Sequence, residues 1–110
     1  MITHIVFWKL LDDDSHCADE NAARIKRGLE ALVGVVPGML SAQVGRAINQ
    51  AEYDLCLLST FETAAALRDY RVNPDHVKVA DFVHKAVCAR TSLDFESDNL
   101  MDSGIDPYVF

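Results

Sequence analysis

The sequence has no apolar run long enough to cross a bilayer, because its longest apolar runs are only a few residues long. Basic residues are scarce: 10 Lys and Arg stand against 17 Asp and Glu, which gives a formal net charge of −7. A surface of that sign repels nucleic-acid phosphates and anionic lipids, so we expect neither as a partner. The opening MITHIVFWKLL lacks a basic segment and a small-residue cleavage site, and it predicts a strand rather than a signal peptide.

Cysteine is also rare. Cys17, Cys56 and Cys88 form an odd set without a Cys-x-x-Cys pair, so the sequence predicts no disulfide framework. Cys56 and Cys88 lie within apolar patterns and are expected to be small buried residues. Unpaired cysteines favour a cytoplasmic location.

The motifs that usually carry cofactor, metal or nucleophile chemistry are missing. The chain has no Gly-rich phosphate loop, nucleotide fingerprint or Gly-x-Ser-x-Gly elbow. His16 and Cys17 are adjacent and His76 and His84 are eight residues apart, and neither spacing fits a closed zinc site. The acidic run at residues 12–14 is typical of a solvated loop. We therefore expect no metal and no cofactor.

What is present is the pattern of one small α+β domain. The chain has 110 residues, half of them apolar, which is enough for a single core. In residues 2–11 apolar side chains alternate on both faces, which predicts a strand covered on both sides. Periodicity and turn residues predict the other elements, which are helix 18–33, strands 39–48 and 53–62, helices 64–72 and 74–89, and strand 90–96.

This order is the β-α-β-β-α-β arrangement of a ferredoxin-like fold with a four-stranded antiparallel sheet. Its helices would cover one sheet face, which leaves a second apolar face carrying Ile5, Phe7 and Leu58. We expect that face to be buried against a second copy of the chain, so that a homodimer forms. Residues 1–96 would form the domain, and the tail, residues 97–110, would dock on a neighbour or be disordered.

Five segments stand out along the chain, namely MITHIVFWKL, VVPGMLSAQVGR, YDLCLLSTFET, LRDYRVNPDHV and SLDFE, which together span about residues 1–96. In this order and spacing they resemble the stress-responsive α/β-barrel (Dabb) domain family. The resemblance implies a homodimer whose two sheets face one another as a dimeric α+β barrel. Most members of this family have no assigned reaction, so the resemblance does not imply a particular chemistry.

The chain is also similar to plant polyketide cyclases of the olivetolic acid type, which belong to the same family. Such cyclases close a linear polyketide acid with a pocket between sheet and helices, and His4, Tyr70 and His76 match their pocket residues. The chain departs from this pattern at two positions: Leu29 stands where the cyclase has a tyrosine, and Asn73 stands where the family has a histidine.

The residues themselves indicate how such a pocket would work. His76 lies in the first turn of its helix, where the helix dipole disfavours a positive charge, so a neutral imidazole can act as general base. Tyr70 would donate its hydroxyl to a carbonyl or enolate oxygen, and His4 would be the second acid-base group. The predicted apolar walls of the pocket are Val6, Trp8, Leu29, Val79 and Phe82.

Three functions fit these features. The first is a family domain of unassigned reaction, a homodimer with a small apolar or aromatic ligand between sheet and helices. The second is a cofactor-free cyclase or oxygenase-like enzyme that uses His4 and His76 as acid and base. The third is a purely structural dimer in which His4, Tyr70 and His76 only fill the core.

Overall fold

The structure, a computed structural model, describes residues 1–97. Its elements, in chain order, are β1 (Ile2–Leu10), α1 (Ala18–Glu30), β2 (Met39–Arg46), β3 (Leu55–Phe61), α2 (Ala64–Val72), α3 (Pro74–Ala86) and β4 (Val87–Glu96). The strands form one antiparallel sheet in the order β2-β3-β1-β4. The predicted ferredoxin-like order is confirmed, with its second helical region divided into α2 and α3. The predicted tail, Ser97 apart, lies outside the described residues.

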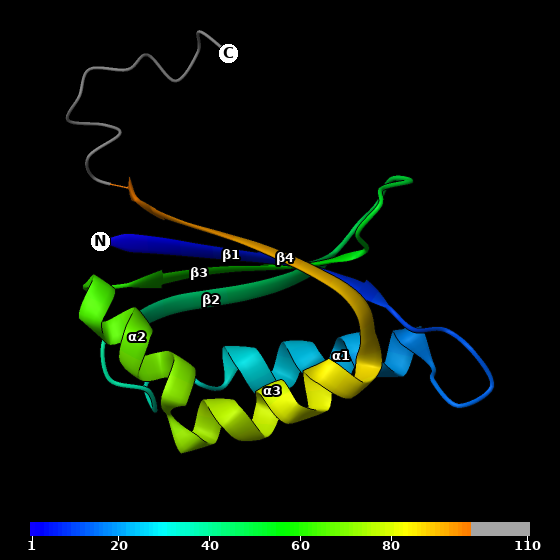
Figure 1. Ribbon diagram of the computed structural model, residues 1–110, viewed down its shortest axis with the longest axis horizontal. Coiled ribbons are helices and arrows are strands. Elements are labelled where there is room, and N and C mark those ends of the chain that lie inside the picture. Colours follow the sequence, from blue (N-terminus) through cyan, green and yellow to red (C-terminus); the bar gives the residue numbers. More distant parts are fainter. Residues whose placement is uncertain (98–110) are drawn as a thin grey trace, which may run out of the picture.

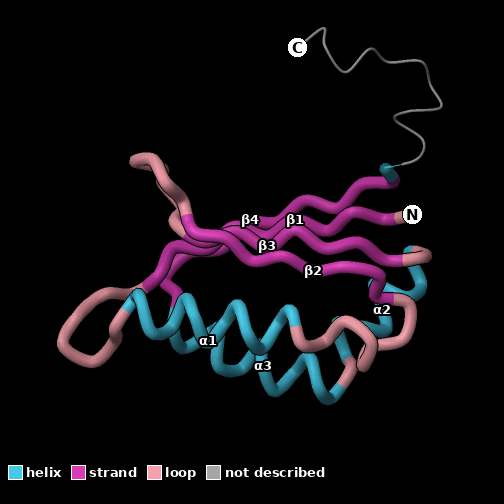
Figure 2. Tube along the Cα trace, turned by 180° about the vertical axis from the view of Figure 1, so that it is seen from behind, coloured by secondary structure: helices cyan, strands magenta, loops and turns pink. Residues whose placement is uncertain are grey.

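The molecule has two layers. All three helices cover one face of the sheet, and the opposite face carries no helix (Figure 1). The loop between β2 and β3 turns away from the helices and rises on the side of that open face, which both views show (Figures 1 and 2). One sheet face is therefore the wall of the core, and the other is available for contacts outside the described chain.

The core lies between the sheet and the helices. In β1 the side chains of Val6, Trp8 and Leu10 point toward the helices and are buried, and His4 shares this face. From the other elements Ile25, Leu29, Leu57, Phe61, Tyr70 and Val83 complete the centre of the core. The face predicted for His4 is therefore the observed one.

A sharp break in the helical layer is encoded by two adjacent residues. Asn73 ends α2 and caps α3, because its side-chain oxygen accepts a hydrogen bond from the Asp75 amide at 2.9 Å. Pro74 follows at the first position of α3, where its missing amide hydrogen costs no bond. Tyr70 therefore lies in the last turn of α2 and His76 in the first turn of α3, and both can face the same space.

Two predicted helices extended too far. α1 ends at Glu30 instead of Val33, because residues 31–36 form tight turns around Gly34, whose φ is +87°. α3 ends at Ala86 instead of residue 89. From Val87 the chain pairs with Leu10 of β1, so the last strand begins three residues earlier than predicted. Local turn bonds end α1, and the pairing of β4 with β1 ends α3.

Strand β2 and one cysteine also differ from the predictions. β2 ends at Arg46, so Ile48, predicted within this strand, is fully exposed. Its pairing with β3 shifts between Met39 and Ser41, which takes Leu40 out of the expected alternation. Cys88 is exposed because it lies on β4 at the edge of the sheet, whereas Cys56 is half-buried.

Helix α1 also protects the opposite edge of the sheet. The Val44 amide on β2 donates to Glu30 Oε2 at 2.8 Å, and Lys26 Nζ donates to the Val44 carbonyl, also at 2.8 Å. Lys26 and Glu30 pair with each other at 2.7 Å. Both outward main-chain groups of Val44 are therefore bonded to side chains of α1, and we call this arrangement the Val44 clamp.

Candidate functional site

A cavity of about 290 Å³ lies between the sheet and α3. Its inner wall is apolar and comes from β1, α1, β3 and α3, with Val6, Trp8, Leu29, Leu57 and Val83. Polar side chains lie among this wall and toward the mouth, namely His4, Tyr70, Arg71, His76, Asp81, His84 and Arg90. An apolar space with a few converging polar groups is the usual form of a small-molecule site.

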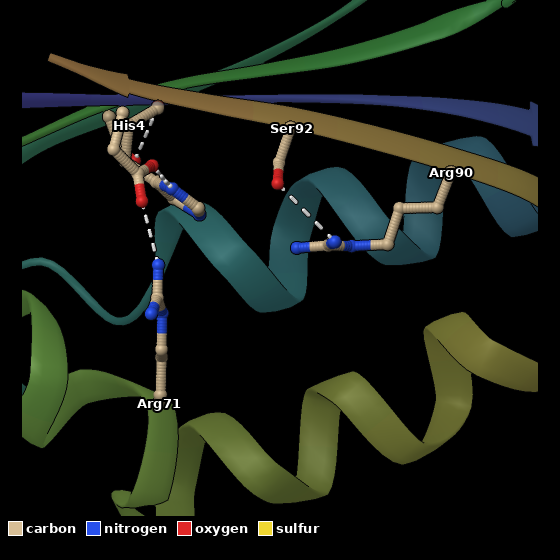
Figure 3. Close-up of polar contacts among 6 residues, drawn as sticks. His4, Arg71, Arg90 and Ser92 are labelled. Carbon is tan, nitrogen blue, oxygen red and sulfur yellow. Dashed lines mark hydrogen bonds and ion pairs between the residues drawn. The ribbon is translucent and has the colours of Figure 1, made fainter.

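His4 is held by a chain of charged contacts that crosses three elements. β1 and β4 pair so that His4 faces Asp94, and His4 Nδ1 hydrogen-bonds Asp94 Oδ1. The other carboxylate oxygen of Asp94 accepts from Arg71 of α2 at 2.7 Å (Figure 3). Because an ionised carboxylate only accepts, Nδ1 of His4 carries the proton in this bond, and Nε2 is free for acid-base work.

Tyr70 and His76 form a stacked pair across the α2–α3 break. Their ring centroids are 3.9 Å apart and the ring planes are inclined by 33°. The His4 ring meets the Tyr70 ring edge-on, with centroids 6.3 Å apart. The three predicted catalytic side chains are thus brought together on one cavity, from β1, α2 and α3.

Burial changes the proton affinity of both rings in this pair. It raises the pKa of Tyr70 to about 12, although the positive charge of Arg90 partly opposes the shift. Burial lowers the pKa of His76, since the charged imidazolium loses hydration, and nearby backbone groups of Arg71 and Tyr70 oppose this in part. At neutral pH Tyr70 is therefore a hydrogen-bond donor and His76 is a neutral ring.

The Nδ1 atom of His76 is buried and makes no hydrogen bond of ordinary geometry within residues 1–97, although the backbone groups of Arg71 and Tyr70 act on the ring. Buried polar atoms of this kind are rare because each costs roughly 1–3 kcal/mol. A bound molecule with a matching polar group would satisfy it. This orphaned nitrogen separates the arrangement from one in which the three rings merely complete the core.

The predicted walls are found in two places. Val6, Trp8 and Leu29 line the cavity as expected. Val79 and Phe82 are instead directed toward α1: a Cβ built on Gly28 would be 3.0 Å from Val79 Cγ1, and Arg24 lies 3.8 Å over the Phe82 ring. The helical stripe that holds His76 is therefore continued by Val83, and the prediction for Val79 and Phe82 is corrected.

The sequence analysis missed several polar residues of the site, including Arg71, Arg90 and Asp94. One available signal was the alternation in β4, where Arg90, Ser92 and Asp94 share the face that pairs with Trp8, Val6 and His4. Polar residues on the helix-covered face of a strand depart from the core pattern and indicate a site. No local signal exists for Arg71, which reaches Asp94 only through the packing of α2.

A second hollow, of about 690 Å³, lies on the open face of the sheet. Phe7, Cys56, Leu58 and Thr91 form its floor, and the β2–β3 loop with Tyr53 forms its side. Phe7 and Tyr53 contact each other there, with ring centroids 6.2 Å apart. This hollow is separate from the cavity that holds His4 and His76.

Within residues 1–97, no three His, Cys, Asp or Glu side chains come together as ligands for a metal ion. Over the same residues, no helix has the length and apolarity needed to cross a membrane.

The fold and the cavity define a ferredoxin-like α+β domain with a ligand-sized space between sheet and helices. The sequence model of the stress responsive A/B barrel domain family (Dabb) matches residues 2–97. The chain belongs to this family. A comparison with curated proteins found no match.

Several solved structures share this fold. A dimeric protein of unknown function from Bacteroides fragilis has 26% identity and a TM-score of 0.77, over 86% of this chain and 94% of its own. A Dabb family protein from Mesorhizobium loti has 22% identity and a TM-score of 0.68, over the same shares. The hydroxynitrile lyase of Passiflora edulis has 19% identity and a TM-score of 0.73, over 86% and 90%. At identities below 25% the likeness concerns the fold alone.

Proposed function

We propose that this protein is a homodimer and that each subunit binds a small apolar or aromatic molecule in the cavity between β1 and α3. The observation that carries the proposal is the buried, unpartnered Nδ1 atom of His76 beside an apolar space of about 290 Å³. That volume is near the lower end of the range for small-molecule sites. A purely structural dimer gives no reason to leave this nitrogen unbonded.

The homodimer is supported by the open face and by the structural neighbours. Phe7, Leu58 and Leu93 are 38%, 45% and 61% exposed on that face, a cost in water that a second copy would remove. The neighbour from Bacteroides fragilis is described as dimeric. We place the interface on the open face because the helix-covered face is already buried.

The single tryptophan provides the test of ligand binding, because Trp8 lines the cavity. Titration with para-butylbenzamide, a neutral aromatic probe, should change Trp8 fluorescence in a saturable way. Ala80→Phe fills the cavity from α3 and should weaken binding at least about tenfold, whereas Ala65→Phe at an exposed position of α2 should not. Equal binding by both folded variants would refute the cavity as the site.

Acid-base catalysis is the second candidate function, and the states of the two stacked rings favour it. A neutral His76 can take a proton from the carbon next to a substrate carbonyl, and the C–H electron pair then moves onto the carbonyl oxygen. The Tyr70 hydroxyl, which its raised pKa keeps protonated, would donate to the resulting enolate oxygen. His4, oriented by Asp94, is the second group that can move a proton.

Exchange of substrate hydrogen with solvent tests this chemistry without knowledge of the natural substrate. The protein should accelerate deuterium incorporation into the acidic carbon of an aryl β-diketone. His76→Gln should lower the catalysed rate by about 10²–10⁴-fold. His16→Gln changes an exposed loop histidine and is the matched control. An unchanged rate in His76→Gln would exclude His76 as the base while leaving the binding proposal intact.

A further inference from the structure

The side chains around the cavity have the opposite charge balance to the rest of the chain. The sequence as a whole is acidic, with a formal net charge of −7. Among the described residues that line the cavity, two are arginines, three are histidines, and Asp81 is the one acid. With the histidines neutral, the two arginine charges against one carboxylate still leave the lining positive, and a positive lining attracts an anion and raises its local concentration.

Of the two arginines that line the cavity, Arg90 is the one without an ion-pair partner among residues 1–97, and it is exposed to solvent. It pairs with Trp8 across β1 and β4, which directs its side chain to the helix-covered side of the sheet. Figure 3 shows the side chain extending from β4 beneath the sheet, with its guanidinium group directed toward His4. Within residues 1–97, no carboxylate lies at ion-pair distance from Arg90, and its one hydrogen bond is to Ser92 Oγ at 3.5 Å.

Arg71 is the useful contrast, because it lines the same cavity and its charge is already paired. Its guanidinium donates to Asp94, which in turn holds His4. Arg71 therefore belongs to the support of His4. Arg90 keeps most of its five N–H donors available in a planar fork that matches the two oxygens of a carboxylate.

We propose that Arg90 binds the carboxylate of the ligand, so that the molecules recognised by this protein are small acids with an apolar or aromatic body. This inference rests on the proposed function, since it requires that a small molecule occupies the cavity. The apolar body would lie against Trp8 and Leu29, and the acid group would lie at Arg90. Between them the ligand would pass the stacked rings of Tyr70 and His76.

The position of Arg90 relative to Tyr70 supports this placement. The Arg90 charge acts on the Tyr70 phenol strongly enough to oppose part of its burial effect, so the two side chains are electrostatic neighbours. A carboxylate at Arg90 would therefore place the atoms next to it near Tyr70. Arg90 is a positioning and specificity residue in this scheme, and the proton transfer belongs to His76.

A matched pair of probes tests the inference. Para-butylbenzoate and para-butylbenzamide have nearly the same shape and differ in charge, and Trp8 fluorescence reports both. The native protein should bind the benzoate at least about tenfold more tightly than the amide, as expected for a charge-assisted pair with arginine. Arg90→Gln should bring the ratio of the two dissociation constants close to one, chiefly by weakening benzoate binding.

Two further variants make the result specific. Arg27→Gln removes the same charge from an exposed position of α1 and should keep the native ratio. Arg90→Lys keeps the charge without the planar fork, and the ratio should fall between those of the native protein and Arg90→Gln. This variant also separates loss of recognition from loss of folding, which circular dichroism checks for both.

Two results would overturn the proposal. Equal affinity of the native protein for the two probes would remove the assigned substrate class, and an unchanged ratio in folded Arg90→Gln would remove Arg90 from recognition. Either result leaves the proposed function standing if Ala80→Phe still weakens binding of the amide. The proposed function fails separately, when neither probe is affected by filling the cavity.

Discussion

The surroundings of the His76 imidazole determine its protonation state and its free bonding capacity. It lies in the first turn of α3, is stacked on Tyr70 and has a buried nitrogen without a partner. Burial favours the neutral ring, and the positive end of the helix dipole acts in the same direction. A base that is neutral over the physiological range is what proton abstraction requires.

This gives a pH prediction for His76. Its lowered pKa places the midpoint of an NMR titration of the ring below about 6.5, the value for free histidine. The unfolded chain then binds a proton more readily than the native chain, so the free energy of unfolding should fall as pH drops below about 6.5. His76→Gln should remove this part of the pH dependence. A titration midpoint at or above 6.5 would contradict the account of burial.

The contacts of His4 lead to a second prediction, on stability. Asp94→Ala removes the acceptor of the buried His4 Nδ1 proton, so we expect a loss of about 1–3 kcal/mol in the free energy of unfolding. Arg71→Ala removes only the outer member of the chain, whose side chain is 54% exposed, and should cost less than about 1 kcal/mol. Urea denaturation measures both. Equal losses would show that Asp94 acts mainly through Arg71.

At the scale of elements, the sequence was sufficient for the order of strands and helices and for the break at Asn73-Pro74. These features depend on local periodicity and on capping residues, and both can be recognised in a sequence. The ends of α1, β2 and α3 differed by two to three residues, because they depend on turns and on the pairing of β4 with β1. The pairing of β4 with β1 joins residues far apart in the chain, and the turns after α1 depend on the positive φ of Gly34.

The same distinction explains the candidate site. His4, Tyr70 and His76 were proposed because they match the pocket residues of the plant cyclases, and because local patterns place them on one strand face and beside the helix break. Asp94 and Arg71 were not, since they reach His4 only after β4 pairs with β1 and α2 packs beneath them. The predicted positions of Val79 and Phe82 were wrong because α3 has two neighbouring apolar faces. The spacing of its residues alone does not show which of these faces packs against α1.

The contact between α1 and β2 gives a prediction at this scale. The ion pair with Lys26 and the bond from the Val44 amide hold the pKa of Glu30 below its usual range. Glu30 therefore stabilises the fold above about pH 4.3, and this contribution is lost as pH falls through its lower native pKa. Glu30→Gln should reduce the acid dependence of unfolding over that range, and Glu52→Gln, in the exposed β2–β3 loop, should leave it unchanged.

On the scale of the whole molecule, the two faces of the sheet have different surroundings. One face forms the core and the cavity, while the open face offers apolar side chains and a hollow under the β2–β3 loop. Burying these side chains would contribute roughly 25 cal/mol for each Å² of apolar surface removed from water. The family likeness and the open face thus lead to the same expected assembly.

The homodimer is tested by charge placed on the open face. Ile5 is half-buried there and pairs with Leu58 and Leu93 on the neighbouring strands. Ile5→Asp should shift the protein from dimer to monomer in analytical ultracentrifugation at micromolar concentration. Val72→Asp adds the same charge at an exposed apolar position of α2 and should leave the dimer intact. A native protein that sediments as a single chain would refute the homodimer.

The Val44 clamp affects how copies of this protein can associate through the β2 edge. An outermost strand with free main-chain groups can recruit another strand, and repetition of that step builds open-ended fibres. At β2 both outward main-chain groups of Val44, in the second half of the strand, are already bonded to Lys26 and Glu30. Addition of a strand at Val44 on the β2 edge requires breaking these bonds first, whereas association through the open face of the sheet does not. The clamp thereby opposes the addition of a strand at this position of β2.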